Sequence, residues 1–108
     1  MPVYNKLVRD KILEIIKANG QKPTHKILTA DEYAVELTKK LAEEVEEYKK
    51  DKNTDELADI MEVVYALASL HSCTAEELEK IRAEKAEKRG GFEKKIFLVE
   101  VMDQGEYV

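Results

Sequence analysis

Apolar residues recur every three or four positions along most of this chain, and this periodicity predicts an all-α fold. The predicted helices cover about residues 7–18, 30–50, 55–70 and 74–88. Thr29 with Glu32, and Thr74 with Glu77, have the spacing of capping boxes at the start of the second and fourth helices. We therefore expect a bundle of about four helices.

The segments outside these helices carry turn and strand signals. An Asn-Gly pair at 19–20 and a Gly-Gly pair at 90–91 should end the first and fourth helices, and Asn53 or Thr54 should cap the third. Residues 96–101, Ile-Phe-Leu-Val-Glu-Val, predict a short C-terminal strand. Its partner would be residues 26–28 or a second subunit. The end of the chain, 103–108, is expected to fray.

Length and composition narrow the class of protein. The 108 residues suit one domain, residues 1–108, and the net charge of −5 argues against broad binding to nucleic acid. The single cysteine, Cys73, excludes an internal disulfide. No apolar stretch approaches the roughly 20 residues that span a membrane, and no signal peptide is evident. We expect a cytoplasmic protein with no nucleic-acid or membrane partner.

Two acidic motifs on consecutive helices are the most informative feature of the sequence. Glu43-Glu44-x-x-Glu47 lies in the second predicted helix, and Glu56-x-x-Asp59 lies at the start of the third. Residues three apart on a helix share a face, so each motif can present two carboxylates side by side. Because a short turn makes the two helices antiparallel neighbours, the two acidic pairs are expected to converge.

The helical wheel sets these acids apart from an ordinary solvated face. In the second helix Glu44 falls near the middle of the apolar stripe, which runs through Tyr33, Leu37, Leu41 and Tyr48, and Glu47 falls on its edge. In the third helix the stripe contains Leu57, Ile60, Val63, Val64 and Leu67. Glu56 falls within that stripe and Asp59 on its flank.

Carboxylates inside an apolar stripe need compensation. Buried ionised carboxylates are costly, and several together repel one another. A hard divalent cation such as Mg²⁺ removes both problems, because it prefers oxygen ligands. The sequence has no His or Cys pairs at zinc-like spacing, so we expect magnesium rather than zinc.

Basic residues suited to polyphosphate accompany the acidic motifs. The candidates are Lys6, Arg9, Lys40, Arg82, Lys85 and Arg89. The last three share a face of the fourth predicted helix, beside Leu78 and Ala86, and that face is expected to look inward. The alternative is that these three pair with glutamates of neighbouring helices.

Three segments together resemble a known family. The E-E-x-x-E and E-x-x-D motifs resemble those of the MazG-like all-α nucleotide pyrophosphohydrolases. The opening Tyr-Asn-Lys-Leu-Val-Arg-Asp-Lys-Ile at 4–12 and the Lys-Arg-Gly-Gly-Phe at 88–92 are similar to a compact single-domain branch of that superfamily. The resemblance covers nearly the whole chain, and the three segments in this order are more specific than the acidic motif alone.

The resemblance implies an activity, a cofactor and a set of ligands. The activity is Mg²⁺-dependent hydrolysis of a nucleoside triphosphate, often a non-standard or damaged one, to the monophosphate and pyrophosphate, with Mn²⁺ as a possible substitute. By motif position the metal ligands would be Glu44, Glu47, Glu56 and Asp59. Glu43 or Glu47 would activate the attacking water. A homodimer or higher homo-oligomer is implied as well.

Two alternatives stay open at this point. The first is phosphoribosyl-ATP as substrate. The histidine-pathway members of the superfamily typically have a Tyr-His pair after the second motif, whereas here Tyr65 has no adjacent His. The second is a non-catalytic helical dimer that binds nucleotide or a protein partner. Such a module would show neither metal dependence nor turnover.

Overall fold

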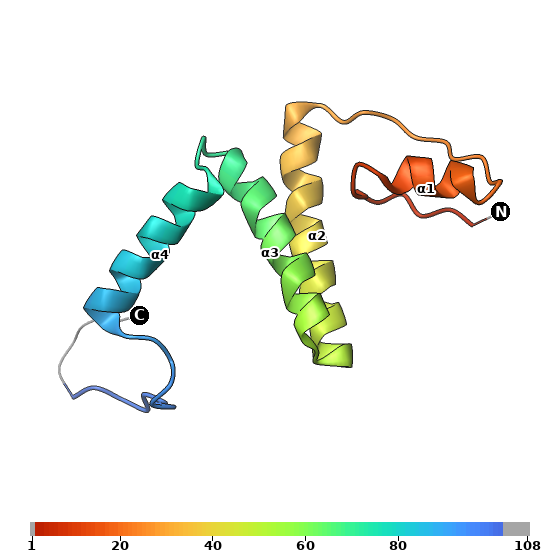
Figure 1. Ribbon diagram of the computed structural model, residues 1–108. Helices are drawn as coiled ribbons and strands as arrows, with labels where there is room; N and C mark the ends of the chain where they lie inside the picture. The colour runs from red at the N-terminus through yellow and green to blue at the C-terminus, as the bar shows by residue number, and fades with distance from the viewer. Residues whose placement is uncertain (1, 103–108) are drawn as a thin grey trace. The chain divides into compact units, whose positions relative to one another are not determined.

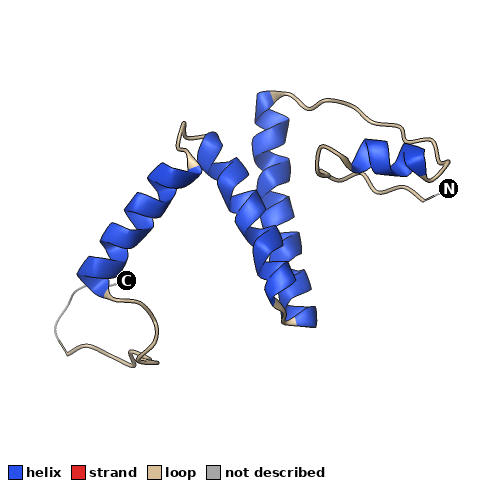
Figure 2. Ribbon diagram, viewed as in Figure 1, coloured by secondary structure: helices blue, strands red, loops and turns tan. Residues whose placement is uncertain are grey.

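The computed structural model describes residues 2–102, which contain four α-helices and no β-strand (Figures 1 and 2). The helices are α1 (Ile12–Ala18), α2 (Ala30–Asp51), α3 (Thr54–Ser69) and α4 (Ala75–Arg89). The predicted all-α fold class is confirmed. The chain divides into two compact units between Ala75 and Glu76, with α1, α2 and α3 in the first. None of the described helices is long and apolar enough to cross a membrane.

Side-chain caps define where α2 and α3 begin. At α2 the predicted capping box is complete: the Glu32 N–H donates to Thr29 Oγ1 at 3.2 Å, and the Thr29 N–H donates to Glu32 Oε1 at 2.9 Å. At α3 the Glu56 N–H donates to Asn53 Oδ1 at 3.1 Å, so Asn53 rather than Thr54 is the cap. Each cap satisfies a backbone donor that the first helical turn leaves unpaired.

The first helix is shorter than predicted. It begins at Ile12 instead of Leu7. In the segment before it, the backbone of Asn5 is left-handed, with φ of 46°, and Lys6 and Arg9 pair with acids of α2 and α3. Its predicted end is confirmed. Gly20 has φ of 80°, and a pair of hydrogen bonds, from the N–H groups of residues 20 and 21 to the carbonyls of residues 17 and 16, closes the helix as a Schellman motif.

Helices α2 and α3 form a hairpin that contains the core of the first unit (Figure 1). Leu37, Val63 and Ala68 are buried, with 2%, 7% and 8% of their surface exposed. The prediction that Leu57 and Tyr48 belong to the buried stripe is wrong, since they are 43% and 36% exposed. Two helices bury one line of contact, and the flank of each apolar stripe stays open.

The predicted C-terminal strand is absent. Residues 96–101 have no strand partner in the described chain, and neither do residues 26–28. Phe97 and Val99 are 89% and 84% exposed. An extended segment becomes a strand only when a neighbour satisfies its backbone N–H and C=O groups, so the apolar composition alone did not suffice. Helix α4 ends before Gly90 as predicted, with φ of 80° at that glycine. Residues 103–108 lie outside the described residues.

Candidate metal centre

The two acidic motifs converge beside the turn between α2 and α3. Carboxylate oxygens of Glu44, Glu56 and Asp59 lie within 4.8 Å of one another, and all three residues are half-buried. In a second group, carboxylate oxygens of Glu47, Asp51 and Glu56 also lie within 4.8 Å of one another. The two groups share Glu56. All four ligands that the sequence predicts are therefore brought together in two overlapping groups.

The donor set fits a magnesium ion. Mg²⁺ binds oxygen ligands at about 2.1 Å, so oxygens on opposite sides of the ion are about 4.2 Å apart. Adjacent oxygens around the ion are only about 3 Å apart, so the oxygens of each group, which lie within 4.8 Å of one another, would close around the ion by side-chain rotation. No His or Cys belongs to either group in the described chain, and an all-carboxylate set suits a hard cation.

Glu56 is half-buried and lies among other carboxylates. Desolvation raises the pKa of its carboxyl group above the usual range, and the negative charges of Asp51, Asp59 and Glu47 raise the pKa further. The Asn53 cap fixes its backbone at the start of α3. A cation bound between these carboxylates would reverse the repulsion.

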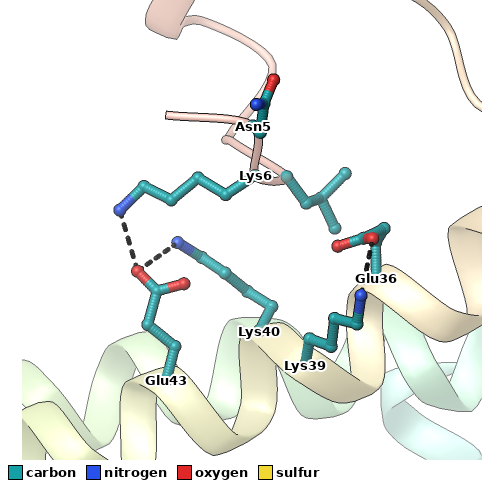
Figure 3. Close-up of a pocket in the computed structure, with 7 residues that line it drawn as sticks. Asn5, Lys6, Glu36, Lys39, Lys40 and Glu43 are labelled. Carbon is teal, nitrogen blue, oxygen red and sulfur yellow. Dashed lines mark hydrogen bonds and ion pairs between the residues drawn. The ribbon is translucent and has the colours of Figure 1, made fainter. Parts of the chain in front are cut away.

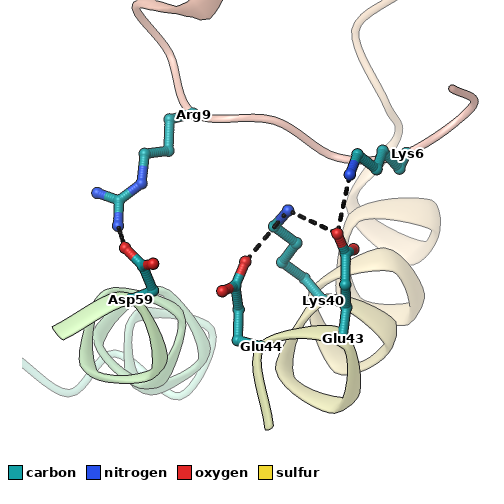
Figure 4. A network of polar contacts seen from close by, with 6 residues as sticks. All are labelled: Lys6, Arg9, Lys40, Glu43, Glu44 and Asp59. Atoms are coloured by element: carbon teal, nitrogen blue, oxygen red, sulfur yellow. Dashed lines mark hydrogen bonds and ion pairs between the residues drawn. The ribbon is translucent and has the colours of Figure 1, made fainter. Parts of the chain in front are cut away.

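Glu43 has a different environment from the other acids. Its Oε1 accepts hydrogen bonds from Lys6 Nζ at 2.9 Å and from Lys40 Nζ at 3.4 Å (Figure 4). The hydrogen bond from Lys6 lowers the pKa of the Glu43 carboxyl group, and the charge of Lys40 adds to this effect. Glu43 belongs to neither carboxylate group, which agrees with a place outside the metal's own ligand set.

Two cations, Arg9 and Lys40, contact the candidate ligands. Arg9 Nη2 donates to Asp59 Oδ1 at 2.7 Å, and Lys40 Nζ lies 3.4 Å from Glu44 Oε1 (Figure 4). The Lys40 and Glu44 side chains are only 17% and 13% exposed, so water screens this pair less than a surface pair. In the described chain no ion pair reaches Glu47, Asp51 or Glu56, so the second group of carboxylates has no internal counter-ion.

A small hollow adjoins this site on the Glu43 side. It has a volume of about 230 Å³ between the N-terminal segment and α2 (Figure 3). Its lining contains three lysines and two glutamates among seven residues, which are Asn5, Lys6, Leu7, Glu36, Lys39, Lys40 and Glu43. Such a lining suits a charged, hydrogen-bonding group rather than an apolar one.

The three basic residues of α4 do not form an inward-facing set within their own unit. Arg82, Lys85 and Arg89 are all exposed. Arg82 donates from Nε and Nη2 to both carboxylate oxygens of Glu79, one turn earlier, at 2.8 and 2.6 Å. The expectation of an inward face was wrong for the described unit, because a helix of mostly charged residues has no apolar stripe to bury. Their part in binding substrate stays a prediction.

Sequence reasoning missed one acidic residue. Asp51 is the last residue of α2, whereas the predicted helix ended at about residue 50. The signal was its spacing: Asp51 follows Glu47 by four residues, so the two share a helix face. Comparisons of the chain with family models, with curated proteins and with solved structures found no match. The candidate site is therefore defined by the geometry of its own residues.

Proposed function

We propose that this protein is a Mg²⁺-dependent nucleoside triphosphate pyrophosphohydrolase of the MazG-like type. The observation that carries the proposal is the convergence of Glu44, Glu56 and Asp59, from two helices, within 4.8 Å. A protein that uses α2 and α3 only for packing has no need of half-buried carboxylates facing one another. The order of the motifs along the chain, which resembles the MazG-like pattern, supports the same conclusion.

The carboxylates would hold the metal. The proposed ligands Glu44, Glu56 and Asp59 form one group, and the proposed ligand Glu47 meets Glu56 and Asp51 in a second. A bound Mg²⁺ would supply charge neutralisation for the triphosphate. The chain's own task is to position the reacting groups, which accounts for most of the catalysis in phosphoryl-type transfer.

Glu47 is the better candidate for the general base. Hydrolysis between the α and β phosphates forms one bond from the water oxygen to phosphorus, breaks the bridging P–O bond and releases a proton from the water. Glu43 is a poor acceptor for this proton, because two lysines bond its Oε1 and its pKa is lowered. Glu47 is exposed, and no ion pair reaches it within the described residues, so no lysine or arginine there competes for the proton.

Cations on the first unit would hold the phosphates. Lys6, Arg9 and Lys40 all lie within hydrogen-bond or ion-pair distance of the acidic motifs. Cations at this spacing from a carboxylate-bound metal match the alternating charges of a metal–polyphosphate complex.

Homodimerisation is the second part of the proposal. Leu57, Met61 and Tyr65 recur every four residues along one face of α3 and are 43%, 45% and 37% exposed. A second copy covering this apolar row would complete the core that two helices leave open. Sedimentation equilibrium should give a dimer for the native chain and a monomer for Met61→Lys. Glu62→Lys, on another face of α3, is the control and should remain dimeric.

The test of the activity is pyrophosphate release from a panel of standard and modified nucleoside triphosphates and phosphoribosyl-ATP, with Mg²⁺ or with EDTA. We expect Mg²⁺-dependent release with a monophosphate product. Glu44→Gln should abolish release, whereas Glu46→Gln, on the same helix but 70% exposed and paired with Lys49, should not. Release from phosphoribosyl-ATP alone would select the alternative substrate. The absence of release from every compound would reject the enzyme.

A further inference from the structure

The N-terminal strap, which we define as residues 2–11, lies against both acidic helices. Lys6 Nζ bonds Glu43 Oε1 on α2 at 2.9 Å, and Arg9 Nη2 bonds Asp59 Oδ1 on α3 at 2.7 Å (Figure 4). The partners are 37 and 50 residues apart in sequence. The same segment that supplies candidate phosphate ligands thus neutralises the acidic motifs.

Charge, rather than apolar burial, holds the strap in place. Only Leu7 of these residues is half-buried, and the others are exposed. The helix that follows, α1, has no buried residue, and α2 and α3 are the one pair of helices in the described chain with close backbone contact. Exposed ion pairs contribute little to stability, so exchanging one of them for another partner costs little.

The two ion pairs differ in whether the acid is a proposed metal ligand. Asp59 belongs to the carboxylate group proposed to hold the metal, whereas Glu43 does not. A guanidinium at 2.7 Å from Asp59 Oδ1 fills one coordination direction of that carboxylate and repels any cation that approaches it. The Lys6–Glu43 pair involves no such competition.

We propose that Arg9 is an exchangeable counter-ion of the metal centre: it neutralises Asp59 before the metal–polyphosphate complex arrives and then transfers to the phosphates. This inference depends on the proposed function. Lys6, whose ammonium has three donors, keeps one bond to Glu43 and so holds the strap beside the site while Arg9 changes partner. Because the displaced guanidinium is only a side-chain length from the metal centre, binding of polyphosphate and binding of metal reinforce each other.

Titration calorimetry with the full chain tests the exchange in two steps. Mg²⁺ alone is titrated first, and inorganic pyrophosphate in excess Mg²⁺ is titrated second. Arg9→Gln should bind Mg²⁺ about two- to fivefold more tightly, since one exposed ion pair no longer competes. The same variant should bind pyrophosphate about tenfold more weakly or worse, since a charge-assisted hydrogen bond is lost.

Lys49→Gln is the matched control. It removes one positive charge from the same unit and breaks a comparable exposed pair, Lys49–Glu46 at 3.0 Å. If general charge explained the effect of Arg9→Gln on Mg²⁺, the control would show it to a similar degree. We expect both affinities of Lys49→Gln to stay within about twofold of the native protein.

Opposite changes in the two affinities support the exchange. An Arg9→Gln variant that binds Mg²⁺ no more tightly than the control, or binds pyrophosphate as well as the native chain, overturns it. The proposed function fails separately, when the native protein itself binds no Mg²⁺.

The native protein offers a test that does not depend on a variant folding. In ¹⁵N NMR spectra, the Arg9 guanidinium protons should exchange slowly with water in the metal-free protein, faster when Mg²⁺ is added, and slowly again when pyrophosphate follows. Guanidinium exchange that is unaffected by Mg²⁺ would also overturn the proposal.

Discussion

Asp51 and Glu56 bring carboxylate oxygens within 4.8 Å of each other across the two-residue turn that joins α2 to α3. One residue ends its helix and the other lies in the first turn of the next. Negative charge is favourable at a helix N-terminus and unfavourable at a C-terminus. Glu56 is therefore well placed for its own helix, whereas the helix dipole does not account for Asp51.

Replacing Glu56 should weaken metal binding and should stabilise the metal-free protein. Because the pKa of Glu56 is raised in the folded chain, its ionisation opposes folding. The contribution of Glu56 to the free energy of unfolding is most favourable below its unfolded-state pKa. This contribution is lost as the pH rises through the folded-state pKa. At neutral pH and without metal, we expect Glu56→Gln to melt at a higher temperature than the native protein, and to lose the increase in melting temperature that Mg²⁺ gives the native chain.

Glu46→Gln is the control for this prediction, because Glu46 is an exposed acid of α2 outside both carboxylate groups. Differential scanning calorimetry in EDTA and in Mg²⁺ makes the comparison. A Glu56→Gln protein that melts lower than the native chain in EDTA would contradict the repulsion described above. One that keeps the full Mg²⁺ response would remove Glu56 from the site.

Glu47 and Glu43 should differ sharply in their effect on turnover. A general base contributes about 10²- to 10⁴-fold, so Glu47→Gln should lower kcat by that range. Glu43→Gln leaves the proposed base intact and should lower kcat by less than about tenfold. Steady-state kinetics with the preferred substrate separates them. If the larger loss belongs to Glu43, the assignment is reversed, and the two lysines on Glu43 orient the base instead of suppressing it.

The hairpin core predicts a large difference between two neighbouring positions on α2. Leu37 is 2% exposed and Val35 is 55% exposed. Leu37→Ala should destabilise the protein by about 2–5 kcal/mol, because it leaves a cavity between α2 and α3. Val35→Ala should cost less than about 0.5 kcal/mol. Urea unfolding followed by circular dichroism measures both, and equal losses would mean that Leu37 does not lie at the centre of the core.

The α2 capping box should make stability depend on pH. A hydrogen bond from the Thr29 backbone N–H lowers the pKa of Glu32, with help from the Thr29 hydroxyl and from Lys26. A lowered pKa contributes stability that is present above the unfolded-state value and is lost as the pH falls through the folded-state value. The native protein should therefore be more stable than Glu32→Gln at about pH 7, and the difference should shrink by about pH 3. Urea unfolding at both values checks this, and a constant difference would contradict it.

The sequence was sufficient for the helices but not for every residue around them. Periodicity and caps located α2, α3 and α4, because those signals are local. The predicted start of α1 was wrong, and the segment before the helix pairs Lys6 and Arg9 with acids 37 and 50 residues away, which local patterns do not reveal. The strand at 96–101 failed for a related reason, since a strand depends on a partner that composition does not reveal.

The candidate site, like the fold, was predictable from the sequence only where its residues lie on helices. Glu44, Glu56 and Asp59 could be found because helix spacing and one short turn determine which faces meet. The pairing of Arg9 with Asp59 could not be, because it depends on the path of a segment without regular structure.

The turn at Lys52 and Asn53 constrains more than the direction of the chain. A surface loop between two helices ordinarily tolerates an extra residue at small entropic cost. Here the turn has only two residues, so one inserted residue would change how α3 follows α2 and would move Glu56 and Asp59 relative to Glu44. Lys52 adopts a left-handed conformation, with φ of 50°, at the end of α2, and Asn53 caps the start of α3. Both turn residues are therefore part of a helix end. In relatives of this chain, insertions and deletions should therefore accumulate between α3 and α4 and be excluded from these two residues.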